Sequence, residues 1–204
     1  MNYSILSNRM KLPEPEISVS EVIFDKKKEK RYLLEKRWDK DGEVLCAFMM
    51  NPSHASHILS DRTVDQLVKY AENNGYGSLI VVNAISFIEP QSNNLKNSTI
   101  HTFDPINWSF IEKAFIKSDH ILFATGYKGQ QALYKFIDSK NSQVINILKK
   151  YRKKFYCYDI KLSARGHNFY YTPHLRPQFH KKPYYKKNPK PLLNFPNYKK
   201  IFRE

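Results

Sequence analysis

The sequence contains no apolar run near the roughly 18 residues needed to cross a membrane. Its first residues, MNYSILSNRMKLPEPEIS, have no apolar centre of the kind found in secretory signal peptides. These two absences predict a cytoplasmic protein without membrane contacts. The chain has 204 residues, of which 41% are hydrophobic, enough to bury one core.

Cysteine is scarce. Cys46 and Cys157 are the two present, and each lies in an apolar run typical of a buried strand, which predicts free thiols rather than a disulfide or a metal site. His54 and His57 have no carboxylate or cysteine partner directly beside them. We therefore expect chemistry that needs no metal and no other cofactor.

Acidic residues are also few, with 19 Asp and Glu against 34 Lys and Arg. Such an excess attracts polyanions through counterion release. It is concentrated in the run Lys149 to Lys154 and in the final stretch HKKPYYKKNPKPLLNFPNYKK, where lysines alternate with aromatic residues. Cations bind phosphates and the neighbouring aromatic rings can stack on bases, so this composition favours a nucleic-acid partner. A solvated basic surface encoded by an AT-rich genome is the alternative.

Strand-like and helix-like segments alternate along most of the chain. Val19 to Phe24 and Arg31 to Arg37 predict an N-terminal β-hairpin. Apolar strand-like segments follow at Val44 to Met50, Ser78 to Val82, His120 to Ala124 and Phe155 to Ile160, with helical spacing between them. This alternation predicts a three-layer α/β/α fold with a mostly parallel central sheet. We expect an arm at residues 1–17, one domain at 18–178 and a basic, aromatic C-terminal tail at 179–204.

The segment EVLCAFMMNPSH runs as an apolar strand and then stops on Asn51-Pro52-Ser53-His54. In an open α/β sheet, such a stop puts polar side chains at the carboxyl end of a strand, where ligands bind. The next buried strand ends on Asn83, and a right-handed βαβ unit would bring Asn51 and Asn83 to one edge of the sheet.

Each candidate residue also has a purely structural interpretation. Asn51 before Pro52 is typical of an Asx turn, and Asn83 is suited to a turn at a strand end. His174, which lies between two prolines, could be a packed loop histidine. Asp61 is well placed to cap the helix that follows it, or to orient Asn51 or a water molecule.

Several stretches of the chain resemble the bacterial family known as domain of unknown function 1643, over roughly residues 30 to 178. They are RYLLEKRW, MMNPSHAS, SDRTVDQLVKYAENNGYGSLIVVNAISF and Gly166 to Pro177. A strand ending in Asn-Pro-Ser, a later strand ending in Asn, and His174 within Pro-His-Leu-Arg-Pro also resemble the uracil-DNA glycosylase superfamily. This second resemblance implies a glycosylase-like fold and a metal-independent enzyme that acts on double-stranded DNA.

The superfamily resemblance implies a role for each matching residue. Asn51 would position the attacking water, Asn83 would read the polar edge of a flipped base, and His174 would stabilise charge on the departing base. Leu175 or Arg176 would enter the base stack. Two features depart from the superfamily pattern, because Pro-His-Leu-Arg-Pro stands where His-Pro-Ser is usual and no aromatic residue lies between His54 and Asp61.

The remaining binding residues follow from the same resemblance. Phe87 is our substitute for the missing aromatic residue, and Ser53 and His54 are expected to border the base. Ser53 stands where a tyrosine closes off the pyrimidine C5 position in uracil-specific members, so its small side chain predicts room for a C5 substituent. Contacts with the DNA are expected from Leu175, Arg176, Lys181, Lys182, Lys186 and Lys187.

We therefore expect a DNA glycosylase that excises a C5-modified pyrimidine, for example hydroxymethylated or glucosylated cytosine of phage DNA, and leaves an abasic site. Such an activity would serve phage defence. Two alternatives come from other classes: a nucleotide or nucleoside N-glycosidase acting on free substrates, and a non-catalytic nucleic-acid-binding module. A metal-dependent nuclease is a more distant alternative. No feature of the sequence calls for an obligate protein partner.

Overall fold

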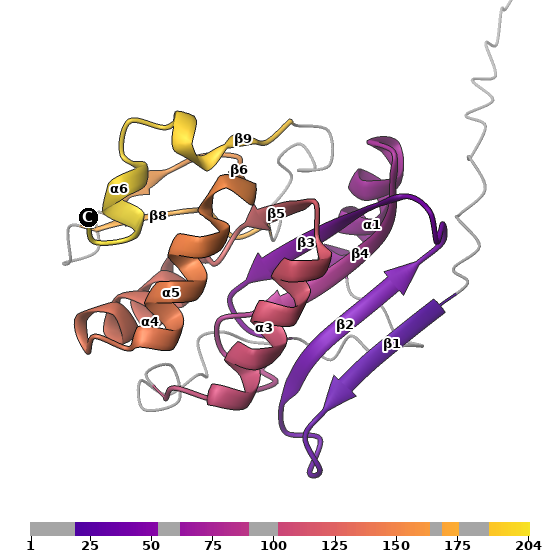
Figure 1. Cartoon of the computed structure of the whole chain (residues 1–204), viewed down its shortest axis with the longest axis horizontal. Helices are drawn as coiled ribbons and strands as arrows, with labels where there is room; N and C mark the ends of the chain where they lie inside the picture. Colours follow the sequence, from indigo (N-terminus) through magenta and orange to yellow (C-terminus); the bar gives the residue numbers. More distant parts are fainter. Residues whose placement is uncertain (1–18, 53–61, 90–101, 164–168, 176–187) are drawn as a thin grey trace, which may run out of the picture.

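The computed structural model describes residues 19–52, 62–89, 102–163, 169–175 and 188–204 (Figure 1). Its strands are β1 (Val19–Phe24), β2 (Arg31–Arg37), β3 (Glu43–Met49), β4 (Tyr76–Asn83), β5 (His120–Phe123), β6 (Phe155–Cys157), β7 (Lys161–Leu162), β8 (Tyr170–Tyr171) and β9 (Lys190–Pro191). Its helices are α1 (Arg62–Asn73), α3 (Pro105–Lys117), α4 (Gly126–Asp138), α5 (Ser142–Tyr151) and α6 (Tyr198–Ile201), with short 3₁₀ turns η2 (Arg152–Lys154) and η4 (Leu192–Asn194).

The central sheet has seven strands in the order β1-β2-β4-β3-β5-β6-β9, and β7 pairs with β8 in a separate small sheet. The α/β class and the hairpin of β1 with β2 are confirmed. The expectation of a mostly parallel sheet is wrong. The pairs β3–β4, β3–β5 and β5–β6 are parallel, but β1–β2, β2–β4 and β6–β9 are antiparallel. The hairpin and the C-terminal strand extend the parallel strands at both edges, which makes the sheet mixed.

Helices cover both faces of this sheet, with α3, α4 and α5 on one face and α1 on the other (Figure 1). Alternate residues of β4 point to opposite faces of the sheet and belong to two different cores. Ile80 and Val82 belong to the core under α3, α4 and α5, whereas Leu79 and Val81 belong to the core under α1. A strand buried on both faces reads as a continuous apolar run, which is why the sequence marks these strands clearly.

Phe48 of β3 lies at the centre of the core under α3. Its side chain has no exposed surface, and its ring meets those of Trp108, Phe115 and Phe123 edge to face, with centroids 6.1, 5.4 and 5.2 Å away. Edge-to-face contacts add to the free energy gained from burying the rings. This cluster anchors β3 beneath α3, and β3 carries the candidate site at its carboxyl end.

The free thiols predicted for Cys46 and Cys157 are confirmed, and both are buried. Burial raises the pKa of Cys46 far above its ordinary value and raises that of Cys157 to about 12. Both thiols therefore stay protonated and unreactive. In the described segments, no helix is long and apolar enough to cross a membrane.

The prediction that residues 179–204 form a separate tail is wrong for the described residues 188–204. Residues 188–204 belong to the domain, because β9 pairs with β6 and both Leu192 and Ile201 are fully buried. Gln130 Nε2 of α4 donates a hydrogen bond of 2.8 Å to the carbonyl of Ile201, and the Tyr134 hydroxyl donates one of 2.7 Å to the carbonyl of Lys200. Apolar side chains among the lysines hold this segment against α4.

Lys154, the last residue of η2, caps the C-terminus of α3. Its Nζ donates hydrogen bonds of 2.5 Å to the carbonyl of Ser118 and 3.3 Å to that of Phe115. Carbonyls at the end of a helix carry partial negative charge and have no partner inside the helix, so a cation there is favourable.

Lys154→Met should lower the free energy of unfolding by about 1 kcal/mol, because the ammonium hydrogen bonds and the helix-end interaction are lost. Urea denaturation measures the change. Lys153→Met is the matched control, since the exposed Lys153 adjoins Lys154. Equal stability of the two variants would contradict the capping role.

Candidate functional site

A crevice of the kind that binds ligands in α/β proteins is expected where β3 and β5 end. These strands are parallel neighbours, but the chain continues from β3 to α1 on one face and from β5 to α4 on the other. Ligands bind at such a switch point, outside the carboxyl ends of the strands. Asn51 follows β3 and Thr125 follows β5 at this point.

The side chain of Asn51 is buried and held by two backbone carbonyls. Its Nδ2 donates hydrogen bonds of 2.7 Å to the oxygen of Glu89 and 3.1 Å to that of Pro52. The Glu89 N–H in turn donates to the Pro52 carbonyl at 3.1 Å. Two acceptors on one side fix the orientation of the amide, since Nδ2 must face them. The Oδ1 atom accepts no hydrogen bond within the described residues.

Asn83 is the last residue of β4 and lies beside Met49 in the parallel register. Hydrogen bonds of 2.9 Å from Ala84 N to Met49 O and from Ile85 N to Met50 O continue the contact beyond the strands. Asn51 and Asn83 therefore lie at the same edge of the sheet, as the βαβ argument requires.

The amide of Asn83 has no exposed surface, and neither of its polar atoms has a hydrogen-bond partner in the described part of the chain. Asn83 alternates with Leu79 and Val81, so its side chain is on the α1 face. A buried amide without partners costs about 1–3 kcal/mol per group and is rare. A polar ligand group at this place would recover that cost.

The first turn of α4 brings His174 to the same edge. A Cβ on Gly126 would lie 3.0 Å from the Cβ of His174, and a Cβ on Gly129 would lie 3.2 Å from the Cα of Met50. The two glycines are three residues apart and share one side of the helix. The Gly126 N–H also donates a hydrogen bond of 2.9 Å to the carbonyl of Thr172. His174 and the residue before Asn51 therefore pack against one turn of α4.

Leu175 requires a correction. It is 3% exposed and packs in the apolar cluster under α1. A side chain buried there is not available to enter a base stack, so the predicted DNA contact of Leu175 is wrong for this structure. The short segment from Thr172 to Leu175 instead crosses the edge of the sheet from the α4 side to the α1 side.

Phe87 is half-buried and already has a cation over its ring. The Nζ of Lys30 lies 4.8 Å from the ring centroid and 2.9 Å from Oδ2 of Asp104, which also accepts a hydrogen bond from Ser86 Oγ at 3.0 Å. The hydrogen bond to Asp104 raises the pKa of Lys30. Burial alone would raise the pKa of Asp104, but hydrogen bonds from Lys30, Asn107 N–H and Ser86 lower it. The pair is therefore fully charged at neutral pH.

Sequence reasoning missed three residues at this edge. Arg31 is 1% exposed, and its N–H donates to the Ser86 carbonyl at 3.0 Å. Thr125 and Thr172 are fully buried, and their hydroxyls have no hydrogen-bond partner in the segments described. A polar residue in a strand normally marks the solvent face, so the pattern predicts an exposed Arg31. No local sequence signal marks the two threonines.

The other predicted site residues lie outside the described residues. They are Ser53, His54, Asp61, Arg176, Lys181, Lys182, Lys186 and Lys187.

The basic run from Lys149 to Lys154 lies at the other end of the parallel strands from Asn51 and Asn83. It ends α5 and forms η2, immediately before the start of β6, so it adjoins the amino ends of the parallel strands. Lys150 pairs with Glu112 at 3.2 Å, and Arg152 pairs with Glu204 at 2.8 Å. This run is therefore distant from Asn51 and Asn83, which lie at the carboxyl ends of their strands.

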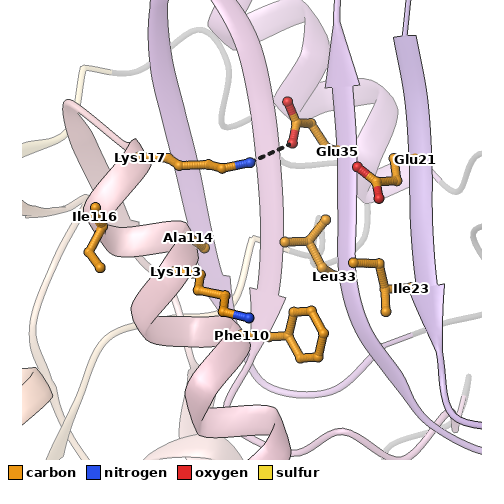
Figure 2. Close-up of a pocket in the computed structure, with 9 residues that line it drawn as sticks. All are labelled: Glu21, Ile23, Leu33, Glu35, Phe110, Lys113, Ala114, Ile116 and Lys117. Atoms are coloured by element: carbon orange, nitrogen blue, oxygen red, sulfur yellow. Dashed lines mark ion pairs between the residues drawn. The ribbon is translucent and has the colours of Figure 1, made fainter.

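A cavity of about 290 Å³ lies on the outer part of the sheet, between β1, β2 and the C-terminal half of α3 (Figure 2). Ile23, Leu33 and Phe110 give it an apolar surface. Lys117 reaches Glu35 at 3.9 Å on one side of it. None of the candidate residues lines this cavity.

Comparison with known proteins gives one match. The model of the family described as "Protein of unknown function (DUF1643)" matches residues 31–169. No curated protein and no solved structure matches the chain.

Proposed function

The chain belongs to the DUF1643 family, whose function is unknown, and we propose that it is a DNA glycosylase that hydrolyses the N-glycosidic bond of a flipped pyrimidine. The proposal is supported by the positions of Asn51, Asn83 and His174 near the carboxyl ends of the parallel strands. These residues supply an oriented amide, a buried amide without a hydrogen-bond partner among the described residues, and an imidazole. Such a set of groups is suited to cleaving the bond between a sugar and a polar heterocyclic base.

Each group has a part in such a reaction. As the bond breaks, the sugar gains oxocarbenium character and the base leaves with negative charge. The electrophilic sugar needs a water held in place more than a deprotonated one, and Asn51 Oδ1 can accept a hydrogen bond from that water. A donor aimed at the departing base lowers the barrier, which is the role of His174. These steps require no metal.

Asn83 would read the base. Its amide offers an NH₂ donor group beside a carbonyl acceptor, which match the donors and acceptors on the Watson–Crick edge of a pyrimidine. Because Asn83 is fully buried, the residues that cover it must shift when the nucleotide enters. A base inside a duplex must first leave the stack, so the proposed enzyme flips its target. The net charge of +15 favours the necessary DNA contact.

The proposed target carries a substituent at C5, as in hydroxymethylated or glucosylated cytosine of phage DNA. This part of the proposal depends on the small side chain of Ser53 and on its place in the Asn51-Pro52-Ser53-His54 motif. Excision would leave abasic sites in modified DNA and spare ordinary cytosine. That selectivity would suit a phage-defence enzyme.

The test uses duplexes that contain a single uracil, 5-hydroxymethylcytosine or glucosylated 5-hydroxymethylcytosine. After incubation with the protein, alkali converts each abasic site into a strand break. We expect breaks at one or both modified cytosines and none at unmodified cytosine. Cleavage of uracil alone would refute the C5 argument, and an absence of breaks on every duplex would refute the glycosylase proposal.

Free modified nucleosides complete the same experiment. Release of base from nucleosides but not from duplexes would indicate an N-glycosidase for small substrates, and its binding would depend weakly on salt. Strand breaks that appear without alkali and disappear with EDTA would indicate a metal-dependent nuclease.

A further inference from the structure

We propose that the cavity between β1, β2 and α3 binds a small zwitterion with an apolar side chain, of the α-amino-acid type (Figure 2). The inference goes beyond the proposed function and does not depend on it, because none of the residues of that function lines the cavity. A volume of about 290 Å³ is at the lower end of the range for small-molecule pockets, which suits a ligand of this size.

One end of the cavity holds a buried carboxylate with an unused acceptor. The side chain of Glu35 is 3% exposed, and its Oε1 forms an ion pair with Arg37. Lys117 Nζ lies 3.9 Å from Oε2, which is too far for a hydrogen bond. Within the described segments, Oε2 therefore accepts no hydrogen bond. A buried, charged oxygen in this state favours a ligand that donates to it.

Glu21 adds a second carboxylate to the same end of the cavity. It lies directly opposite Glu35 in the antiparallel register of β1 and β2, so the two side chains are on the same face of the sheet. Like charges directly opposite each other are destabilising. Glu21 is exposed and has no ion pair in the part of the chain that the structure describes. An ammonium group beside both carboxylates would remove the repulsion and supply the donor that Glu35 Oε2 lacks.

Lys117 provides the complementary charge for a carboxylate. Figure 2 shows it on the helix side of this end of the cavity, with Glu35 and Glu21 on the strand side. The side chain of Lys117 is 59% exposed, so its movement away from Glu35 costs little. In an α-amino acid the ammonium and the carboxylate are attached to the same carbon atom. One head group can therefore contact the strand carboxylates and Lys117 together.

The other end of the cavity is mostly apolar. Ile23 and Leu33 are paired across β1 and β2, and Phe110 and Ala114 line the cavity from α3 (Figure 2). The Nζ of Lys113 lies 5.2 Å from the centroid of the Phe110 ring. An aliphatic or aromatic side chain that extends from the head group into this end would bury apolar surface.

The experiment titrates the full chain with L-leucine and L-phenylalanine by isothermal titration calorimetry. The comparison ligands are the amine that lacks the carboxylate and the acid that lacks the ammonium: isoamylamine and isocaproate for leucine, phenethylamine and hydrocinnamate for phenylalanine. At least one amino acid should bind with a Kd below about 1 mM. Its amine and its acid should each bind about tenfold or more weakly, because each lacks one charge-assisted contact.

Two variants at exposed positions assign the contacts of the head group. Glu21→Gln should reduce the difference in affinity between the amino acid and its acid, because it weakens the contact with the ammonium. Lys117→Met should reduce the difference between the amino acid and its amine. Glu112→Gln and Lys69→Met are the matched controls, since Glu112 pairs with Lys150 and Lys69 is exposed on α1, on the other face of the sheet.

Three results would overturn the inference. One is that neither amino acid binds with a Kd below about 1 mM. Another is that the amines and acids bind as tightly as the amino acids, which would indicate an apolar cavity without a site for the head group. The third is dimerisation in sedimentation velocity without binding of either amino acid, which would show that a second copy of the chain fills the cavity beside the exposed Ile116. Base release, measured on the same samples, tests the proposed function separately.

Discussion

Asn51→Ala should lower the rate of base release by about 1000-fold and leave the affinity for DNA within about twofold. The variant removes the oxygen proposed to orient the attacking water, and loss of one such oriented group costs about two to three orders of magnitude. It also removes the hydrogen bonds to the carbonyls of Pro52 and Glu89, which hold these two segments together. DNA affinity should survive because the amide makes no proposed phosphate contact.

Single-turnover base release and a fluorescence binding titration measure the two quantities separately. Asn74→Ala is the matched control, because Asn74 Nδ2 also donates to a backbone carbonyl, that of Tyr70, but at the end of α1 that leads into the amino end of β4. It should keep full activity. Unchanged base release in Asn51→Ala would exclude the proposed role of Asn51.

A combined variant separates an enzyme from a binding module. If the double variant Asn51→Ala, His174→Ala leaves both DNA binding and any resistance to phage unchanged, the protein does not act through catalysis at this site. The non-catalytic module would then be the better description.

Phe48→Ala should lower the free energy of unfolding by about 3–5 kcal/mol. Phe48 has no exposed surface, and its loss would leave Trp108, Phe115 and Phe123 around an empty space. These rings come from one helix, α3, and one strand, β5, so they cannot close the space without moving the backbone. Unfolding by urea, followed by tryptophan fluorescence and circular dichroism, gives the change.

Phe110→Ala is the comparison for that measurement. Phe110 is half-buried and stacks on Tyr32 at 5.4 Å near the edge of the sheet, so its removal should cost less than half as much. Equal losses for the two variants would show that Phe48 is not the centre of the core. Phe48→Leu should fall between wild type and Phe48→Ala because it fills most of the space.

Much of the fold could be predicted because it depends on local patterns. Continuous apolar runs marked the strands that are buried on both faces, and helical spacing marked the helices between them. The connection from β3 through α1 to β4 was enough to place Asn51 and Asn83 at one edge. Strand direction and handedness determine that result, whatever the distant residues do.

The antiparallel additions to the sheet could not be predicted in the same way. β9 consists of two residues, Lys190 and Pro191, within a stretch rich in lysine and aromatic residues. Its composition indicates a solvated tail. Its place depends on β6 and on contacts with α4, which lie far away in the sequence.

By itself, then, the sequence determined the α/β class, the side of the sheet at which the strands before Asn51 and Asn83 end, and the polar residues that follow them, because these depend on periodicity and chain direction. Only the tertiary structure decided how those residues are used. Asn51 is oriented by Glu89, which is 38 positions away, and Leu175 is buried under α1. The physical reason is that hydrogen bonds and side-chain packing join segments whose separation along the chain leaves no local pattern.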